Sequence, residues 1–189
     1  DARGNVVQEY LPYFSSSLSF HTWEHQDPIE SSFDGLNRLL TQSLPATATQ
    51  SSTYTSRKYY PLALWVQDTA QTLSGGKYSG AGKHMYFDGL GKLRLISEVV
   101  GVDDSGERGG LQEWNTQYDF DGLGNFTRLI DAYGTERHMV YDGLNREVYA
   151  SDPNRGEIWR RYNSASKLIT ELDSRGVKRF YQYDGANRI

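Results

Sequence analysis

The sequence predicts an all-β fold built from repeated antiparallel hairpins, and three observations support this prediction. First, the 189 residues include 14 Tyr, 7 Phe, 4 Trp and 19 Gly, whereas hydrophobic residues make up only 37%. Such a composition favours strands and turns over helices. Second, one five-residue template recurs along the chain. Third, the aromatic residues that open its copies at positions 120, 141, 162 and 183 are each 21 residues apart, a fixed period that is typical of repeat architectures.

The template consists of an aromatic residue, Asp, Gly, an apolar residue, and then Gly or Asn. In most copies the next residue is basic. A sixth and weaker copy runs from Tyr162 to Ser166, and the repeat aromatics are therefore Phe33, Phe87, Phe120, Tyr141, Tyr162 and Tyr183. The turn residues of the five full copies are Asp34, Gly35 and Asn37; Asp88, Gly89 and Gly91; Asp121, Gly122 and Gly124; Asp142, Gly143 and Asn145; Asp184, Gly185 and Asn187.

Each copy is predicted to form a tight hairpin turn. The Asp side chain can accept hydrogen bonds from backbone N–H groups two or three residues further on. Gly and Asn, at the last position, tolerate a positive φ at the lowest cost. A type I turn followed by a left-handed residue is a common three-residue hairpin connection with a bulge. The aromatic residue therefore ends one strand and the basic residue opens the next.

A second set of turns with similar chemistry falls between the copies. Asp131–Gly134, Asp152–Gly156 and Asp173–Gly176 lie about ten residues after the Asp, or equivalent Asn, of the preceding copy. Asp1–Gly4 and Asp103–Gly106 look like further members of this set. Each unit of 21 residues is then strand, turn, strand, turn, with strands of about six residues, which is an ordinary length.

Three regions are expected within one continuous segment of a longer protein. Residues 1–40 hold the first template hairpins, and residues 81–189 form the main repeat sheet. Residues 41–80 are predicted to be an irregular Ser/Thr-rich connection that contains a degenerate repeat starting at Tyr54. Nine Ser or Thr residues and one Pro within 41–56 favour this interpretation.

The alternation of side chains places the repeat tyrosines on one face of the predicted sheet. Tyr141, Tyr162 and Tyr183 share that face, whereas the opposite face mixes charged residues with Trp159 and Phe180. Since neither face is purely apolar, a compact sandwich with one apolar core is not expected. The pattern suits a large sheet, one side of which lines a wet or partly filled cavity, and whose units gain stability from their neighbours.

Repeated elements such as Tyr141–Arg146 and Phe87–Lys92, which recur every 21 residues from Phe120 onward and are separated by Asp-x-x-Gly turns, resemble the YD repeats of Rhs-type proteins. This family includes the B and C components of bacterial toxin complexes and the teneurins. The resemblance covers residues 87–189 well, 1–40 moderately and 41–80 poorly. It implies a β-sheet strip that spirals into a hollow shell around a toxic C-terminal polypeptide. The implied partners are the flanking YD repeats and that cargo, and the implied location is a secreted or cell-surface bacterial protein.

Composition excludes several other classes of protein. The chain has 20 Lys and Arg against 24 Asp and Glu, so it lacks the basic excess of a nucleic-acid groove. Its longest apolar run, Leu62–Val66, is too short to span a membrane. Cysteine is absent, which rules out disulfides and thiolate metal sites.

One motif invites an enzymatic interpretation. His21, Glu24 and His25 match the H-x-x-E-H pattern of inverted zincins, which requires both histidines on one face of a helix. Asp27-Pro28 follows closely and leaves little room for a helix, and no third ligand is identifiable. On a strand the two histidines would lie about 13 Å apart, too far to bind one ion.

The sequence as a whole therefore predicts a structural protein that is not an enzyme and uses no metal or cofactor. Two alternatives stay open. The first is a cell-surface β module that binds glycans, because exposed aromatic residues with Asp and Asn on a β surface are typical of sugar-binding faces. The second is a zinc-dependent hydrolase that uses His21, Glu24 and His25.

Overall fold

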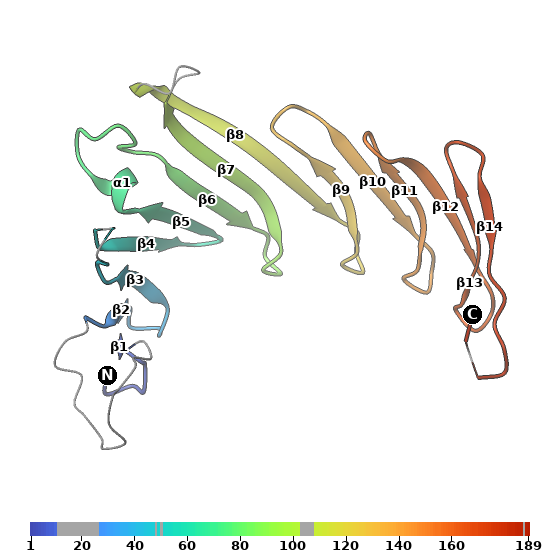
Figure 1. Cartoon of the computed structure of the whole chain (residues 1–189), viewed down its shortest axis with the longest axis horizontal. Coiled ribbons are helices and arrows are strands. Elements are labelled where there is room, and N and C mark those ends of the chain that lie inside the picture. The colour runs from blue at the N-terminus through green and yellow to red at the C-terminus, as the bar shows by residue number, and fades with distance from the viewer. Residues whose placement is uncertain (11–26, 48, 50, 103–107, 187) are drawn as a thin grey trace. The chain divides into compact units, whose positions relative to one another are not determined.

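The structure is a computed structural model, and it describes residues 1–10, 27–47, 49, 51–102, 108–186 and 188–189. Within these residues the chain forms a 14-stranded antiparallel sheet in which every strand is hydrogen-bonded to its neighbours in sequence. The all-β prediction is therefore confirmed. The order of the strands is that of a simple succession of hairpins (Figure 1).

The strands divide into two units, which are described separately. The N-terminal unit comprises Asp1–Gly91 and Ser97–Trp114, and the C-terminal unit comprises Lys92–Ile96 and Asn115–Ile189. Strands β7 and β8 contribute residues to both units. The strands are β1 Gln8–Glu9, β2 Ile29–Phe33, β3 Leu39–Leu44, β4 Thr53–Tyr60, β5 Ala63–Asp68, β6 Gly82–Phe87, β7 Leu93–Val102, β8 Arg108–Phe120, β9 Phe126–Ile130, β10 Glu136–Tyr141, β11 Glu147–Asp152, β12 Gly156–Tyr162, β13 Leu168–Asp173 and β14 Lys178–Phe180.

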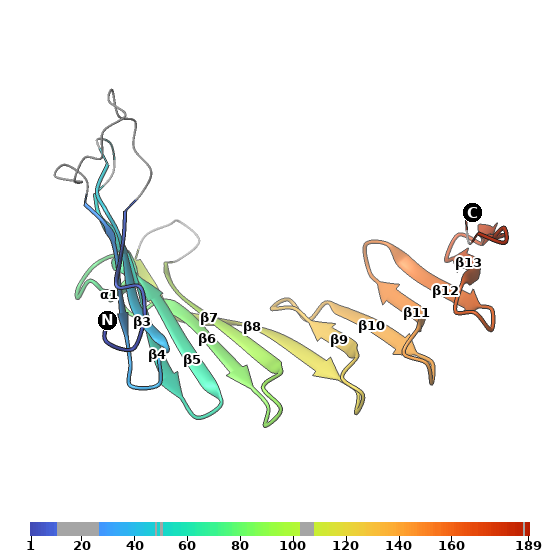
Figure 2. The ribbon, with the colours of Figure 1, turned by 90° about the horizontal axis from the view of Figure 1, so that it is seen from below.

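In the C-terminal unit the strands follow the predicted repeat closely. Strands β9 to β14 form a regular meander, visible in two perpendicular views (Figures 1 and 2). Turns of the template lie along one edge of this meander, and the turns that start at Asp131, Asp152 and Asp173 lie along the other. This arrangement follows directly from short strands, of five to seven residues in β9 to β13 and three in β14, joined by tight turns.

Residues 41–80 contain more regular structure than the sequence-based expectation, although about half of them lie outside any strand or helix. They contain the end of β3, all of β4 and β5, and the helix α1 (Thr69–Thr72). Thr and Tyr recur within Thr53–Tyr60, and β-branched and aromatic residues fit a pleated, half-buried surface. Of the nine Ser and Thr residues within 41–56, five lie in β3 or β4 and four lie between these strands, so their density does not distinguish a polar strand from a loop. Helix α1 is short and begins with a capping box formed by Asp68 and Gln71.

The sheet lacks a conventional hydrophobic core within the described residues. Among the residues that the structure describes, Ala81 and Val99 are the only buried apolar side chains, and no large side chain is fully buried. Stability must therefore come from backbone pairing and from side-chain contacts between neighbouring strands, as in other repeat proteins. In the same part of the chain no helix has the length and hydropathy needed to cross a bilayer.

Candidate functional site: repeat turns, tyrosine contacts and a hydroxyl-lined groove

The Asp of each template turn binds the backbone of its own turn. In the turn that starts at Asp142, its Oδ1 accepts hydrogen bonds from the N–H groups of Leu144 (2.9 Å) and Arg146 (3.1 Å). Its Oδ2 accepts a bond from Arg146 Nε at 2.8 Å. Asp34 and Asp184 make the same set of bonds. Asp121 makes the two backbone bonds and accepts a bond from Asn125 Nδ2 in place of an arginine, and Asn163 reproduces the two backbone bonds with its side-chain oxygen.

These hydrogen bonds favour the ionised carboxylate. The pKa of Asp142 is lowered, chiefly by the hydrogen bond from the Arg146 side chain. The pKa of Asp34 is lowered chiefly by the backbone N–H of Arg38. A carboxylate whose oxygens are occupied by donors of its own turn is a poor candidate for acid–base chemistry. The described template aspartates are therefore placed as turn caps.

The fourth turn position has the left-handed backbone that the template implies. The φ angles are +61° at Asn37, +76° at Gly91, +92° at Gly124, +59° at Asn145 and +59° at Ser166. The strand register shifts beside four of these turns, as expected for a bulge. Asn187 lies outside the described residues.

The Gly that follows each template Asp has no comparable steric role. A Cβ added at Gly35, Gly89, Gly122, Gly143 or Gly185 would meet no atom within 4 Å, and none of these residues has a positive φ. The weaker copy has Ser164 at this position. We find no packing reason for glycine here.

Turns on the other edge of the C-terminal unit use the same chemistry. The Oδ1 of Asp131 accepts the N–H groups of Tyr133 and Thr135, each at 2.9 Å. Gly134 and Gly176 have φ angles of +79°. The predicted turn at Asp103–Gly106 lies outside the described residues.

The turn at Asp1–Gly4 lies on the edge of the sheet that carries the template turns. The sequence-based assignment of this turn to the set between the copies is therefore wrong. Asn5 Nδ2 donates to Asn37 Oδ1 at 3.0 Å, and an Arg3 guanidinium nitrogen donates to the Asp34 carbonyl. The first turn therefore lies beside the turn that starts at Asp34. The sequence misled here because Asp-x-x-Gly fits both edges equally well.

A tyrosine from one hairpin contacts the basic residue of the preceding turn. The Arg146 guanidinium lies 4.9 Å from the ring centre of Tyr162, within the range of a cation–π interaction. The Tyr162 hydroxyl donates to the carbonyl of Glu147, the residue after Arg146, at 2.8 Å. We call this pair of interactions the tyrosine contact. Lys167 and Tyr183 repeat it, with 5.9 Å to the ring centre and 3.0 Å to the Leu168 carbonyl.

The N-terminal unit contains the same tyrosine contact. Arg38 lies 4.3 Å from the ring centre of Tyr59, and the Tyr59 hydroxyl donates to the Leu39 carbonyl at 3.1 Å. Tyr59 is thus the aromatic residue of the degenerate repeat, and the expected start at Tyr54 is wrong. Tyr54 lies on the other face of β4 because side chains alternate along a strand. The spacing of 21 from Phe33 pointed to Tyr54, but the connection between β3 and β4 (residues 45–52) is five residues longer than the corresponding connection between β11 and β12 (residues 153–155).

Two template turns end in Asn instead of a basic residue, and they contact the next turn differently. Asn125 Nδ2 donates to Asn145 Oδ1 at 3.1 Å, just as Asn5 donates to Asn37. The choice of Asn over Gly at the positive-φ position thus supplies an acceptor for the neighbouring turn. From the template alone Gly and Asn look equivalent at this position, although the joint presence of Asn125 and Asn145 was a usable signal.

Alternating charges cross the strands of the C-terminal unit. On one face Glu147, Arg160, Glu171 and Arg179 form a continuous row, with Arg179 Nη1 2.9 Å from Glu171 Oε1. A second row joins Arg94, Asp119, Arg128 and Glu136, with Arg94 Nη2 2.9 Å from Asp119 Oδ1. Opposite charges across neighbouring strands fix the register but are only partly buried, so each pair contributes modestly to stability.

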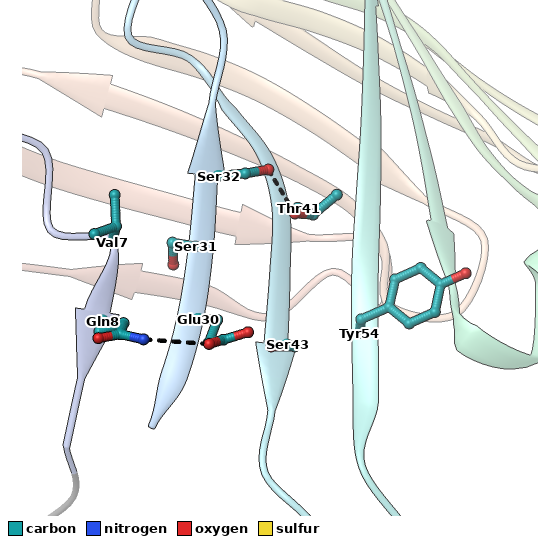
Figure 3. A pocket seen from close by; sticks show the side chains of 8 residues that line it. All are labelled: Val7, Gln8, Glu30, Ser31, Ser32, Thr41, Ser43 and Tyr54. Carbon is teal, nitrogen blue, oxygen red and sulfur yellow. Dashed lines mark hydrogen bonds between the residues drawn. The ribbon is translucent and has the colours of Figure 1, made fainter. Parts of the chain in front are cut away.

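The N-terminal unit carries a groove of about 520 Å³ instead of an ionic row (Figure 3). Its lining comes from β1 to β4 and from Val7, just before β1, and is mostly small and polar. Gln8 donates to Glu30 at 3.3 Å, and the Ser32 and Thr41 hydroxyls lie 2.6 Å apart. The lining residues are Val7, Gln8, Glu30, Ser31, Ser32, Thr41, Ser43 and Tyr54.

No metal site is found among the described residues, which contain no group of three potential ligands. His21, Glu24 and His25 lie outside the described residues, so the zinc hypothesis is not tested by the fold.

Solved structures with a similar fold are known. A crystal structure of TcdB2-TccC3-TEV matches 97% of this chain with a TM-score of 0.73 and 14% sequence identity. The fold is that of a TcdB2-TccC3 segment. A crystal structure of TcdB2-TccC3 and the structure of the Photorhabdus luminescens Tc holotoxin pore match 83% of the chain, with TM-scores of 0.67 and 0.68 and 14% identity each. A scan of protein-family models and a search of curated proteins find no match.

The likeness to TcdB2-TccC3 confirms, at the level of the fold, the resemblance to Rhs-type YD-repeat proteins. It extends across most of residues 41–80, where the sequence resemblance is poor. The chain spans only 8–9% of the length of the TcdB2-TccC3 chains that it matches.

Proposed function

We propose that this chain is a non-enzymatic structural segment of an Rhs/YD-repeat shell that encloses a toxic polypeptide. The observation that carries the proposal is the likeness to TcdB2-TccC3 over 97% of the chain. The repeat turns agree with it, because their carboxylates accept hydrogen bonds from the backbone of their own turns. The turn residues named from the sequence then have an architectural role.

The tyrosine contacts explain how such a segment would build a shell wall. Each links a turn to the next hairpin, so a sheet without a hydrophobic core is joined repeat by repeat. The proposed partners are the flanking YD repeats of the same polypeptide and the enclosed cargo. The proposed location is a secreted or cell-surface bacterial protein.

The test uses the parent polypeptide that contains these residues together with its C-terminal region. Electron microscopy should show a closed hollow particle, and limited proteolysis should leave the C-terminal polypeptide protected. A Tyr162→Ala variant should expose that polypeptide to cleavage, whereas Tyr133→Ala should not, because the Tyr133 side chain is 80% exposed in a turn on the other edge. An open chain with freely cleaved cargo would overturn the proposal.

Metal analysis separates the structural role from the zinc hydrolase alternative. The purified chain should contain no stoichiometric zinc. One zinc per chain, lost in a His21→Ala variant, would instead support the enzyme.

A further inference from the structure

The N-terminal unit has one sheet face whose chemistry the structural role does not use. Alternation along β4 places Tyr54, Ser56, Lys58 and Tyr60 on this face, opposite to Tyr59 and its tyrosine contact. We call it the groove face. It carries the groove of Figure 3 on strands β1 to β4.

Among the described lining residues, the groove offers hydroxyl, amide and carboxylate groups, and Glu30 carries the only formal charge. Ser and Thr hydroxyls can each donate and accept hydrogen bonds, and the Gln8 amide can do both. Glu30 supplies acceptor oxygens. This set matches a ligand that is rich in hydroxyl groups, whereas a phosphate or other anion would find no cation among the lining residues that the structure describes.

A cluster of aromatic rings lies further along the same face. Lys58 pairs with Trp65 and Trp65 with His84, while Tyr60 pairs with Ala63 and Ala63 with Tyr86. The ring centres of Trp65 and His84 are 3.8 Å apart, and those of His84 and Tyr86 are 5.8 Å apart.

Part of this cluster is held in place and part is open to solvent. A Cβ at Gly82 would come within 2.7 Å of the Trp65 ring, so the indole packs directly on the backbone there. Tyr60 and Tyr86 are 52% and 38% exposed. Desolvation lowers the pKa of His84, which favours the neutral ring. A fixed aromatic surface costs little conformational entropy when a ligand covers it.

We propose that the groove face binds a neutral oligosaccharide, whose hydroxyls bond in the groove and whose ring faces stack on the aromatic cluster. From Tyr54 to Tyr60 the strand rises by about 20 Å, so the ligand spans several sugar rings. The inference is independent of the shell, because it requires only the N-terminal unit.

The test uses the 189-residue chain with cellohexaose, maltohexaose, chitohexaose and mannohexaose as probes, in calorimetric titrations and saturation-transfer NMR. At least one hexasaccharide should bind saturably with a Kd of about 1 mM or tighter, and its monosaccharide should bind much more weakly. Tyr86→Ala and Glu30→Ala should each weaken binding about tenfold. Both side chains are exposed, and circular dichroism and melting curves should show that the variants stay folded.

Phe180→Ala is the matched control, because Phe180 is a 70% exposed aromatic residue of the C-terminal unit. It should leave binding unchanged. The proposal is overturned if none of the four hexasaccharides binds saturably, or if binding is equally strong in Tyr86→Ala, Glu30→Ala and the parent chain.

Discussion

The tyrosine contact occurs in both units, but the turns that surround it differ. In the C-terminal unit Tyr162 opens a weakened copy of the template, and Arg146 before it belongs to a full copy. In the N-terminal unit Tyr59 is followed by a two-residue loop, Pro61-Leu62, with a φ of +59° at Leu62. The cation and the acceptor carbonyl are nevertheless placed in the same way. The contact between neighbouring hairpins therefore survives where the turn sequence has changed.

The two units also differ in what joins their strands laterally. Rows of opposite charges cross the C-terminal unit, whereas hydroxyl and aromatic pairs cross the groove face of the N-terminal unit. The backbone arrangement is similar in both. The same repeat framework can thus carry sheet faces of very different chemistry while the tyrosine contact between hairpins is kept.

The largest expected difference between the two units is in their stability toward acid. Among the described residues, the lowered turn-aspartate pKa values belong to Asp34 in the N-terminal unit and to Asp121, Asp131, Asp142, Asp173 and Asp184 in the C-terminal unit. A carboxyl whose folded pKa is lowered stabilises the fold above its ordinary value of 3.8, and this stabilisation is lost as pH falls through the folded pKa.

Hydrogen exchange measured between pH 6 and pH 2 should therefore show protection failing first in the C-terminal unit. An Asp142→Asn variant keeps the side-chain oxygen, as Asn163 does naturally, and should make the acid response of its hairpin less steep. Simultaneous loss of protection in both units would contradict the role given to the turn carboxylates.

Removal of the ring should produce the next largest effect, and it should be similar in the two units. Tyr162→Ala and Tyr59→Ala each remove a half-buried ring and its hydroxyl bond, so each should destabilise its unit by about 2–3 kcal/mol. Urea unfolding with exchange-resolved protection measures each unit separately. Tyr133→Ala, with its exposed ring, serves as the control. A large effect at Tyr162 with none at Tyr59 would mean that the two contacts are not equivalent.

The positive-φ position of a C-terminal turn should be more sensitive than the glycine beside it. Gly124→Val should cost about 1 kcal/mol or more, since a β-branched residue resists a φ of +92° and its Cβ would lie 2.1 Å from Lys92 Nζ. Gly122→Ala should be nearly neutral because nothing lies within 4 Å. Thermal melting compares the two variants, and equal melting temperatures would argue against the strain.

The smallest effect is expected at the divergent turn and has the opposite sign. Leu62 holds a left-handed backbone that disfavours a branched side chain, and it is 57% exposed. Leu62→Gly should therefore raise stability by about 0.5 kcal/mol, after the entropy cost of glycine in the unfolded chain is subtracted. A lower melting temperature would show that the Leu62 side chain makes a contribution of its own.

Much of the fold was predictable because it depends on residues that are close together in the sequence. The spacing of Phe120, Tyr141, Tyr162 and Tyr183 and the Asp-x-x-Gly turns specify hairpins without reference to distant residues. Residues 41–80 were misjudged because a polar strand and a polar loop have similar composition. Tyr59 was missed because the turn that follows β4 carries Pro61-Leu62 instead of Asp-Gly. Without the template, only the spacing from Phe33 was left to locate the repeat aromatic, and that spacing pointed to Tyr54.

The surface features were less predictable than the turns. The pairing of Trp65 with His84 depends on the register between β5 and β6, which residues 73–81 between the strands do not encode in any simple way. The hydroxyl-lined groove needs four strands in a specific order before Ser32 meets Thr41. Contacts of this kind can be predicted only when the pairing of distant strands is known.

The tyrosine contact has a consequence for how such chains can grow. Every repeat that follows the pattern presents a ring toward one neighbour, and a cation and a carbonyl toward the other. A duplication that copies one whole period of 21 residues with this contact therefore creates a new junction that is already complementary. Gene duplication of such a period can lengthen the sheet by a whole repeat without any compensating substitution.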